Sequence, residues 1–139
     1  MSWREVLNVG QLFFGNKSVQ AKTYDVQFTV GTEAANVINV AVQLNTPEGV
    51  ALDEVGVLDF YLADDAAGLT PSAVAPTGGI AIGTDGALIE TVANLSGTMI
   101  SEADGDIDID VTDTGTPTFY LVCRLPMGGL AISPAITFA

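Results

Sequence analysis

The chain has 139 residues, a net charge of −13, no histidine and a single cysteine. Three of its four basic residues, Arg4, Lys17 and Lys22, lie in the first 22 positions, which carry a net charge of +2, whereas residues 23–139 carry −15. The missing histidine excludes catalytic triads that use a histidine base. The shortage of lysine and arginine argues against nucleic-acid binding, because affinity for phosphates comes mainly from these residues.

The length indicates one domain, which can bury about two-thirds of its unfolded surface without disulfides or metals. The first residues, MSWREVLNV, lack the apolar core and the cleavage site of a signal peptide, and Cys123 alone cannot form an internal disulfide. No apolar run approaches the ~20 residues that a membrane helix needs. We therefore expect a protein that is made in a cytoplasm and has no membrane partner.

The first half of the body alternates apolar and polar residues, as β-strands do. We expect strands at residues 24–30, 36–45 and 55–62, with turns at 31–33 and 47–49. The second turn contains a proline, whose ring presets a φ angle, and a glycine, which relieves a backbone position that is strained for other residues. In the second strand, one face carries Ile38, Val40, Val42 and Leu44, and the other carries Asn39 and Gln43.

The middle of the chain is predicted to hold a surface loop, a hairpin and two strands. Residues 70–79 contain two prolines and two glycines, which favour a loop. Residues 80–93 are predicted to form a hairpin around Thr84-Asp85-Gly86, because aspartate and glycine tolerate positive φ angles. A short edge strand is expected at 98–101. Residues 106–112 (DIDIDVT) alternate without a fault, with the aliphatic side chains inward and the aspartates outward.

The last two segments are the most hydrophobic. Residues 118–125 (TFYLVCRL) are apolar on both faces, as expected for a central strand. Residues 130–139 are predicted to form an edge or bulged strand, because Pro134 lacks a backbone donor; its apolar residues Leu130, Ile132, Ile136 and Phe138 would share one face. These patterns predict an all-β fold, namely a single immunoglobulin-like or jelly-roll-like β-sandwich over residues 24–139 with an N-terminal arm at residues 1–23.

The N-terminal arm follows neither a strand period nor a helix period. Its candidate partner-binding residues are apolar or basic: Trp3, Arg4, Leu7, Leu12, Phe13, Phe14 and Lys17. So many apolar side chains must pack against another surface. That surface is the sandwich itself, a second copy of the chain or a larger scaffold. An extra strand or lid on its own domain stays open as an alternative to an anchor. The basic residues beside an acidic body favour the anchor.

The acidic residues offer one candidate ion site and no catalytic one. Asp104 and Asp106 flank a turn glycine and could converge on Ca²⁺, but the spacing lacks the glycine and the glutamate of an EF-hand. A solvated acidic face that discourages edge-to-edge pairing is the preferred interpretation. Cys123 is in phase with core residues and has no base to activate it. We therefore expect no enzymatic activity, no metal and no cofactor.

Six segments of the body resemble a recurring β-domain in virion proteins of tailed bacteriophages. They are TYDVQFTVGTEAANVINVAVQL, FYLADDAAG, PTGGIAIGTDGALI, SEADGDIDIDVTDTG, TFYLVCRLP and AITFA. The similarity covers residues 24–139 and leaves the arm outside. The members of this family are small head-decoration, fibre or other structural proteins. The family has no catalytic motif, so the resemblance transfers no functional residues.

The resemblance and the charge split together predict a capsid decoration (cement) protein on the outer head surface of a virion. The arm would bind the major capsid protein and copies of this chain, while the acidic sandwich projects outward. The local three-fold points of a capsid make a homotrimer the expected stoichiometry.

Two alternatives stay open. One is a tail or fibre module that binds a host receptor or glycan, which the lack of aromatic clusters in the predicted loops disfavours. The other is a bacterial surface-layer or adhesin module, which the missing export signal disfavours.

Overall fold

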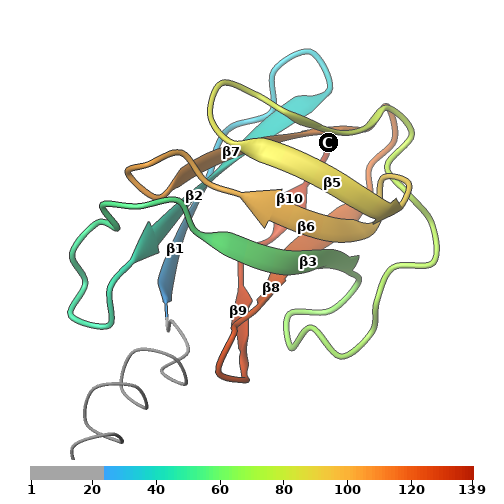
Figure 1. Ribbon diagram of the computed structural model, residues 1–139. Coiled ribbons are helices and arrows are strands. Elements are labelled where there is room, and N and C mark those ends of the chain that lie inside the picture. The colour runs from blue at the N-terminus through green and yellow to red at the C-terminus, as the bar shows by residue number, and fades with distance from the viewer. Residues whose placement is uncertain (1–23) are drawn as a thin grey trace, which may run out of the picture.

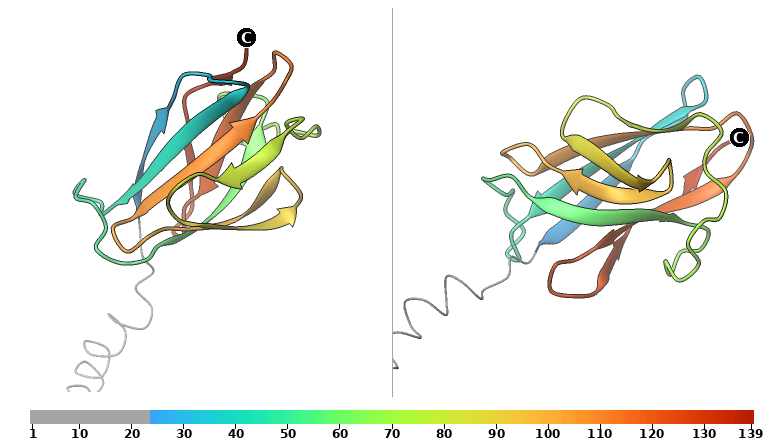
Figure 2. Two further views of the ribbon diagram at one scale, coloured as in Figure 1. Left: turned by 90° about the horizontal axis from the view of Figure 1, so that it is seen from above. Right: turned by 45° about the vertical axis from the view of Figure 1, so that its right-hand side comes forward.

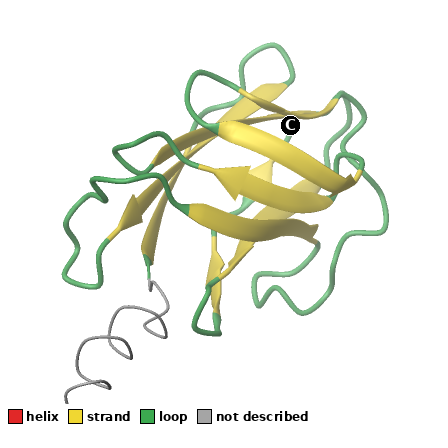
Figure 3. Cartoon of the chain, in the orientation of Figure 1, coloured by secondary structure: helices red, strands yellow, loops and turns green. Residues whose placement is uncertain are grey.

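The computed structural model describes residues 24–139, which form ten strands in two antiparallel sheets packed face to face (Figures 1 and 3). Sheet A has the order β1 (Asp25–Val30), β2 (Val37–Asn45), β7 (Asp106–Thr112) and β4 (Gly79–Ile82). Sheet B has the order β10 (Ile136–Thr137), β8 (Thr118–Arg124), β3 (Val57–Ala63), β6 (Ser96–Ile100) and β5 (Ala87–Val92), and β9 (Leu130–Ile132) also pairs with β8. No helix occurs within residues 24–139, so the predicted β-sandwich is confirmed.

The core lies between the inner faces of the two sheets. The register places Val40 of β2 opposite Ile109 of β7, and Leu62 of β3 opposite Leu121 of β8. All four side chains are buried, as the alternation in the sequence predicted. Burial of each such side chain contributes ~1.5–3 kcal/mol to folding, so these central strands supply much of the stability.

The β1–β2 hairpin turns at a place that the sequence did not indicate. The predicted turn at residues 31–33 is wrong, because the chain reverses at Ala35 and Asn36, between the bridge partners Ala34 and Val37. Ala35 and Asn36 have φ angles of 52° and 68°. Two successive positive φ angles are typical of the type I′ turn, which matches the twist of paired strands. Alanine rarely adopts this conformation, so local propensity gave no signal.

The segment around Thr84-Asp85-Gly86 does not form the predicted hairpin. β4 pairs with β7 in sheet A, whereas β5 pairs with β6 in sheet B, so residues 83–86 carry the chain from one sheet to the other. The strand predicted at 98–101 is present as β6, but its predicted edge position is wrong, because β6 lies between β3 and β5. The edge position belongs to β5 instead.

The C-terminal strand is broken, and its two halves present their side chains to opposite faces. The sequence predicted that Leu130, Ile132, Ile136 and Phe138 share one face. In the structure Leu130 and Ile132 lie on the outer face of sheet B, whereas Ile136 and Phe138 are buried in the core. Between β9 and β10 the chain gains one residue relative to β8, as a β-bulge does. A shift of one residue moves every following side chain to the other face.

Ser133 satisfies the backbone at this break. Its buried hydroxyl accepts a hydrogen bond from the backbone N–H of Leu121 (2.9 Å) and donates one to the carbonyl of Pro134 (2.8 Å). The predicted bulge near Pro134 is therefore confirmed, and a serine side chain replaces part of the missing ladder.

The loops divide the sandwich into two ends. Loops 45–56, 83–86 and 101–105 lie at the end where β1 begins, which we call the β1 end (left side of Figure 1, and Figure 2). Loops 31–36 and 64–78 lie at the opposite end. Eight of the sixteen acidic residues of the body are at the β1 end: Asp25, Glu48, Asp53, Glu54, Asp85, Glu102, Asp104 and Asp106.

Candidate functional site

The candidate partner-binding residues of the arm lie outside the described residues. These residues are Trp3, Arg4, Leu7, Leu12, Phe13, Phe14 and Lys17. The anchor therefore stays a prediction, and the candidate surfaces below belong to the body.

A cluster of three carboxylates lies between the β1 end and the outer face of sheet A. Asp106 and Asp108 project outward from β7, and Asp85 reaches them from the turn between β4 and β5. One carboxylate oxygen from each residue lies within 4.8 Å of the others. The backbone holds this arrangement, because the N–H of Asp108 donates to the carbonyl of Asp85 (2.9 Å). The hydroxyl of Thr84 donates to both the Asp85 and the Asp108 carboxylates.

Burial and the crowding of these charges shift the pKa of one member of the cluster, Asp106. Partial desolvation raises the pKa of the Asp106 carboxyl above its ordinary value, and the negative charges of Asp108, Asp85 and Asp104 raise it further. A side-chain hydrogen bond with Asp85 acts in the same direction. The charged form of Asp106 is therefore disfavoured in the folded protein.

Carboxylate oxygens are the ligands that Ca²⁺ prefers, so Asp85, Asp106 and Asp108 are the described residues that could hold a hard divalent cation. The predicted pair was Asp104 and Asp106, but the Asp104 carboxylate accepts a long hydrogen bond from the N–H of Asp106 (3.3 Å). Sequence reasoning missed Asp85, because it assigned that residue to a hairpin turn. With one converging oxygen from each residue, the cluster supplies three of the six to eight oxygen ligands that Ca²⁺ takes.

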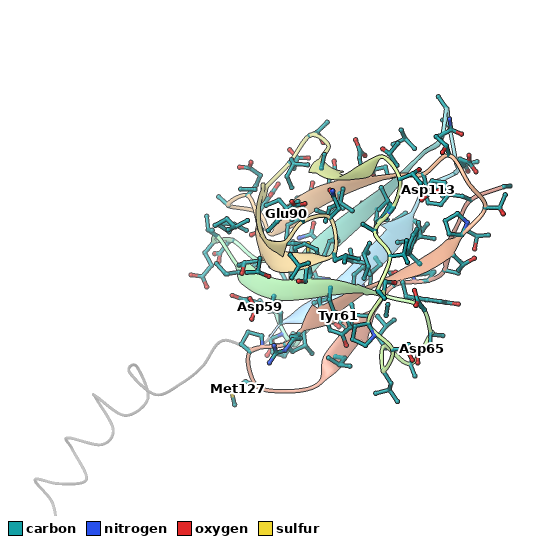
Figure 4. The ribbon with its side chains drawn as sticks, turned by 90° about the vertical axis from the view of Figure 1, so that its right-hand side faces the viewer. Asp59, Tyr61, Asp65, Glu90, Asp113 and Met127 are labelled. Carbon is teal, nitrogen blue, oxygen red and sulfur yellow. The ribbon has the colours of Figure 1, made fainter. Side chains whose placement is uncertain are left out.

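The outer face of sheet B has two different halves. One half is covered by loop 64–78, where the hydroxyl of Tyr61 donates to the carbonyl of Gly68 (2.6 Å). Gly68 has a φ of +69°, and a Cβ there would lie 3.2–3.3 Å from Val122 and Ile132. The other half is open, and there Arg124, the single basic residue of the body, lies opposite Asp59. Figure 4 labels Asp59 and Tyr61, which project from β3 on this face.

A groove of about 580 Å³ lies at the opposite end, between loop 64–78 and the segment after β7. Asp64, Thr77, Asp113 and Thr116 line it with several apolar side chains. The Asp113 carboxylate is buried and accepts hydrogen bonds from the N–H groups of Thr77 (2.8 Å) and Gly115 (2.7 Å). Asp113 therefore joins two loops, and each of its oxygens accepts one backbone hydrogen bond.

Cys123 lies in the core, as its phase predicted. Its side chain is fully buried, and burial raises the pKa of the thiol to about 12. A thiol with so little thiolate is neither a nucleophile nor a metal ligand at neutral pH.

No protein-family model matches the chain, and no curated protein matches it significantly. Within residues 24–139, no helix is long and apolar enough to cross a membrane.

Proposed function

We propose that the chain is a virion structural protein of a tailed bacteriophage, which decorates the outer surface of the capsid and stabilises the shell. The arm binds the major capsid protein and neighbouring copies of the chain. The acidic sandwich projects away from the capsid.

The observation that carries this proposal is the division of the chain into two chemically different parts. The body closes its own core between two sheets and leaves every acidic side chain except that of Asp113 at least partly exposed, which keeps neighbouring surfaces soluble and mutually repelling. The arm carries the only tryptophan of the chain, two phenylalanines and three of the four basic residues. Tryptophan and arginine are typical anchors of protein–protein interfaces.

Binding of the arm would contribute free energy to the stability of the shell. A clamp that binds the assembled lattice, and not dispersed subunits, stabilises the shell by mass action. Three copies around a local three-fold point form a closed ring of contacts, so a homotrimer is the proposed assembly. No metal or cofactor takes part.

The second candidate is a tail or fibre module that recognises a host receptor or glycan. The groove between loop 64–78 and the segment after β7 is the feature that favours it, because threonine hydroxyls and a carboxylate line a concave surface. The Asp64 carboxylate already accepts a hydrogen bond from Ser72, and each oxygen of Asp113 already accepts one from a backbone N–H. Capsid decoration is therefore the better candidate, and binding on a glycan array would favour the second.

Deletion of residues 1–20 tests the proposal. The truncated chain should keep a cooperative melting transition but lose co-sedimentation with particles that lack the protein. A matched control is the full chain with Glu33→Gln, an exchange at the opposite end of the sandwich. A truncated chain that is folded and still binds particles would place the contact on the sandwich. A truncated chain that no longer folds would favour a strand or lid on its own domain.

A further inference from the structure

Exposed apolar side chains lie beside the acidic residues of the β1 end. Val50 and Val55, both in loop 45–56, are 64% and 52% exposed. A depression of about 580 Å³ lies next to them, lined by Leu52, Asp53, Asp85, Glu102, Ala103 and Asp104. The surface thus combines apolar groups with negative charge over a short distance, which suits a partner that is both apolar and basic.

The described part of the chain begins at this surface. The ring of Tyr24 and the side chain of Leu52 lie 3.4 Å and 3.1 Å from the point that a Cβ on Gly56 would occupy. Leu52 also lines the depression. The described part of the chain therefore begins, at Tyr24, at the margin of the β1 end. Met127, which is exposed at the turn between β8 and β9, lies on the side of the molecule where β1 begins (Figures 1 and 4).

The composition of residues 1–23 matches this surface. Lys22 and Lys17 lie two and seven residues before Tyr24, and the arm carries a net charge of +2 over its first 22 residues. Half of the acidic residues of the body are at the β1 end, whereas four are at the opposite end: Glu33, Asp64, Asp65 and Asp113. A segment of 23 residues can extend to roughly 75–80 Å, so its length does not limit which part of the β1 end it reaches.

We propose that the β1 end is a docking surface for the arm of the same chain in the free protein. Apolar side chains of the arm pack beside Val50 and Val55, and its basic residues face Asp53 and Asp104. Attachment within one chain favours this occupant over a second copy, because a tethered segment reaches its site at an effective concentration of about a millimolar. The inference does not rest on capsid binding, which would compete with the docked state if the arm also binds a lattice.

Trp3 reports the docked state without a label, because it is the only tryptophan of the chain. In the full-length protein at low salt, its emission should lie at shorter wavelength than that of N-acetyltryptophanamide. Acrylamide should also quench Trp3 less than it quenches N-acetyltryptophanamide. Raising the ionic strength from about 0.01 M to about 1 M shortens the screening length from about 30 Å to about 3 Å, and should increase quenching.

Variants of the full-length chain locate the surface. Asp53→Asn with Asp104→Asn should lower the ratio of docked to undocked arm by about 1.5- to fivefold for each ion pair lost. The matched control, Glu33→Gln with Asp65→Asn, removes the same charge at the opposite end and keeps oxygen acceptors for the N–H groups of Ala139 and Thr70. That control should leave quenching unchanged.

The apolar part of the surface has its own pair of variants. Val55→Ser should increase the quenching of Trp3, whereas Val74→Ser, at a residue of loop 64–78 that is 75% exposed, should not.

Three results would overturn the proposal. The first is a Trp3 that is quenched like N-acetyltryptophanamide in the native protein at low salt. The second is a protected Trp3 that responds equally to the variants at the two ends, since the arm would then bind elsewhere. The third is protection that grows with protein concentration, which would mean exchange of arms between copies.

Discussion

Replacement of Leu121 by alanine tests whether β8 is a central strand of the core. Leu121 is 1% exposed, lies opposite Leu62 of β3, and is held by the hydrogen bond from its N–H to Ser133. The substitution removes three buried carbon atoms, which corresponds to about 2.4 kcal/mol at ~0.8 kcal/mol per group. The cavity that remains adds to this loss, because the strands paired with β8 on both sides prevent the surroundings from closing it fully. We expect a total of ~2–5 kcal/mol.

The free energy of unfolding is measured by urea denaturation with far-UV circular dichroism, since Trp3 lies outside the described sandwich. Leu69→Ala is the matched control, because Leu69 is 77% exposed in loop 64–78 and the same atoms are removed. Its effect should stay below ~0.5 kcal/mol. An effect of Leu121→Ala below ~0.5 kcal/mol, or equal to that of Leu69→Ala, would refute the placement of the core.

Three further outcomes follow from the described residues. The Asp106 carboxyl has a raised pKa in the folded protein, so its charge destabilises the fold at neutral pH and the cost disappears below its ordinary value of 3.8. Asp106→Asn should therefore raise the melting temperature at pH 7 but not at pH 3, and an equal gain at both would contradict this cause. Calcium should give no saturable rise in melting temperature; a rise that Asp106→Ala abolishes would reveal an ion site in place of a solvated face. Cys123 should react with a thiol reagent only after addition of denaturant, and rapid labelling of the native protein would show that its strand opens.

Strands with strict alternation could be predicted from the sequence, because one period decides both the element and its face. β2 and β7 are the clearest cases, and their inward residues are all buried. The failures occur where a single residue decides the geometry. The β1–β2 hairpin turns at Ala35, whose side chain gives no turn signal, and the extra residue between β9 and β10 changes the face of Ile136 and Phe138.

Sheet membership was the second limit of the sequence. Thr84-Asp85-Gly86 has the chemistry of a turn, but local chemistry does not decide whether the next strand pairs with the previous one or joins the other sheet. The same topology brings Asp85 beside Asp106 and Asp108, more than twenty positions along the chain. The carboxylate cluster could therefore not be recognised before the sheets were known. The depression at the β1 end likewise combines loops 45–56, 83–86 and 101–105, which are distant in sequence.

Cryo-electron microscopy of intact particles tests the central claim most directly. Particles that contain the chain are compared with particles from which its gene has been deleted. We expect the difference density to lie on the outer capsid faces, around local three-fold points, with the sandwich outermost. Difference density confined to the tail or its fibres would contradict capsid decoration, and the absence of any difference would contradict a structural role in the virion.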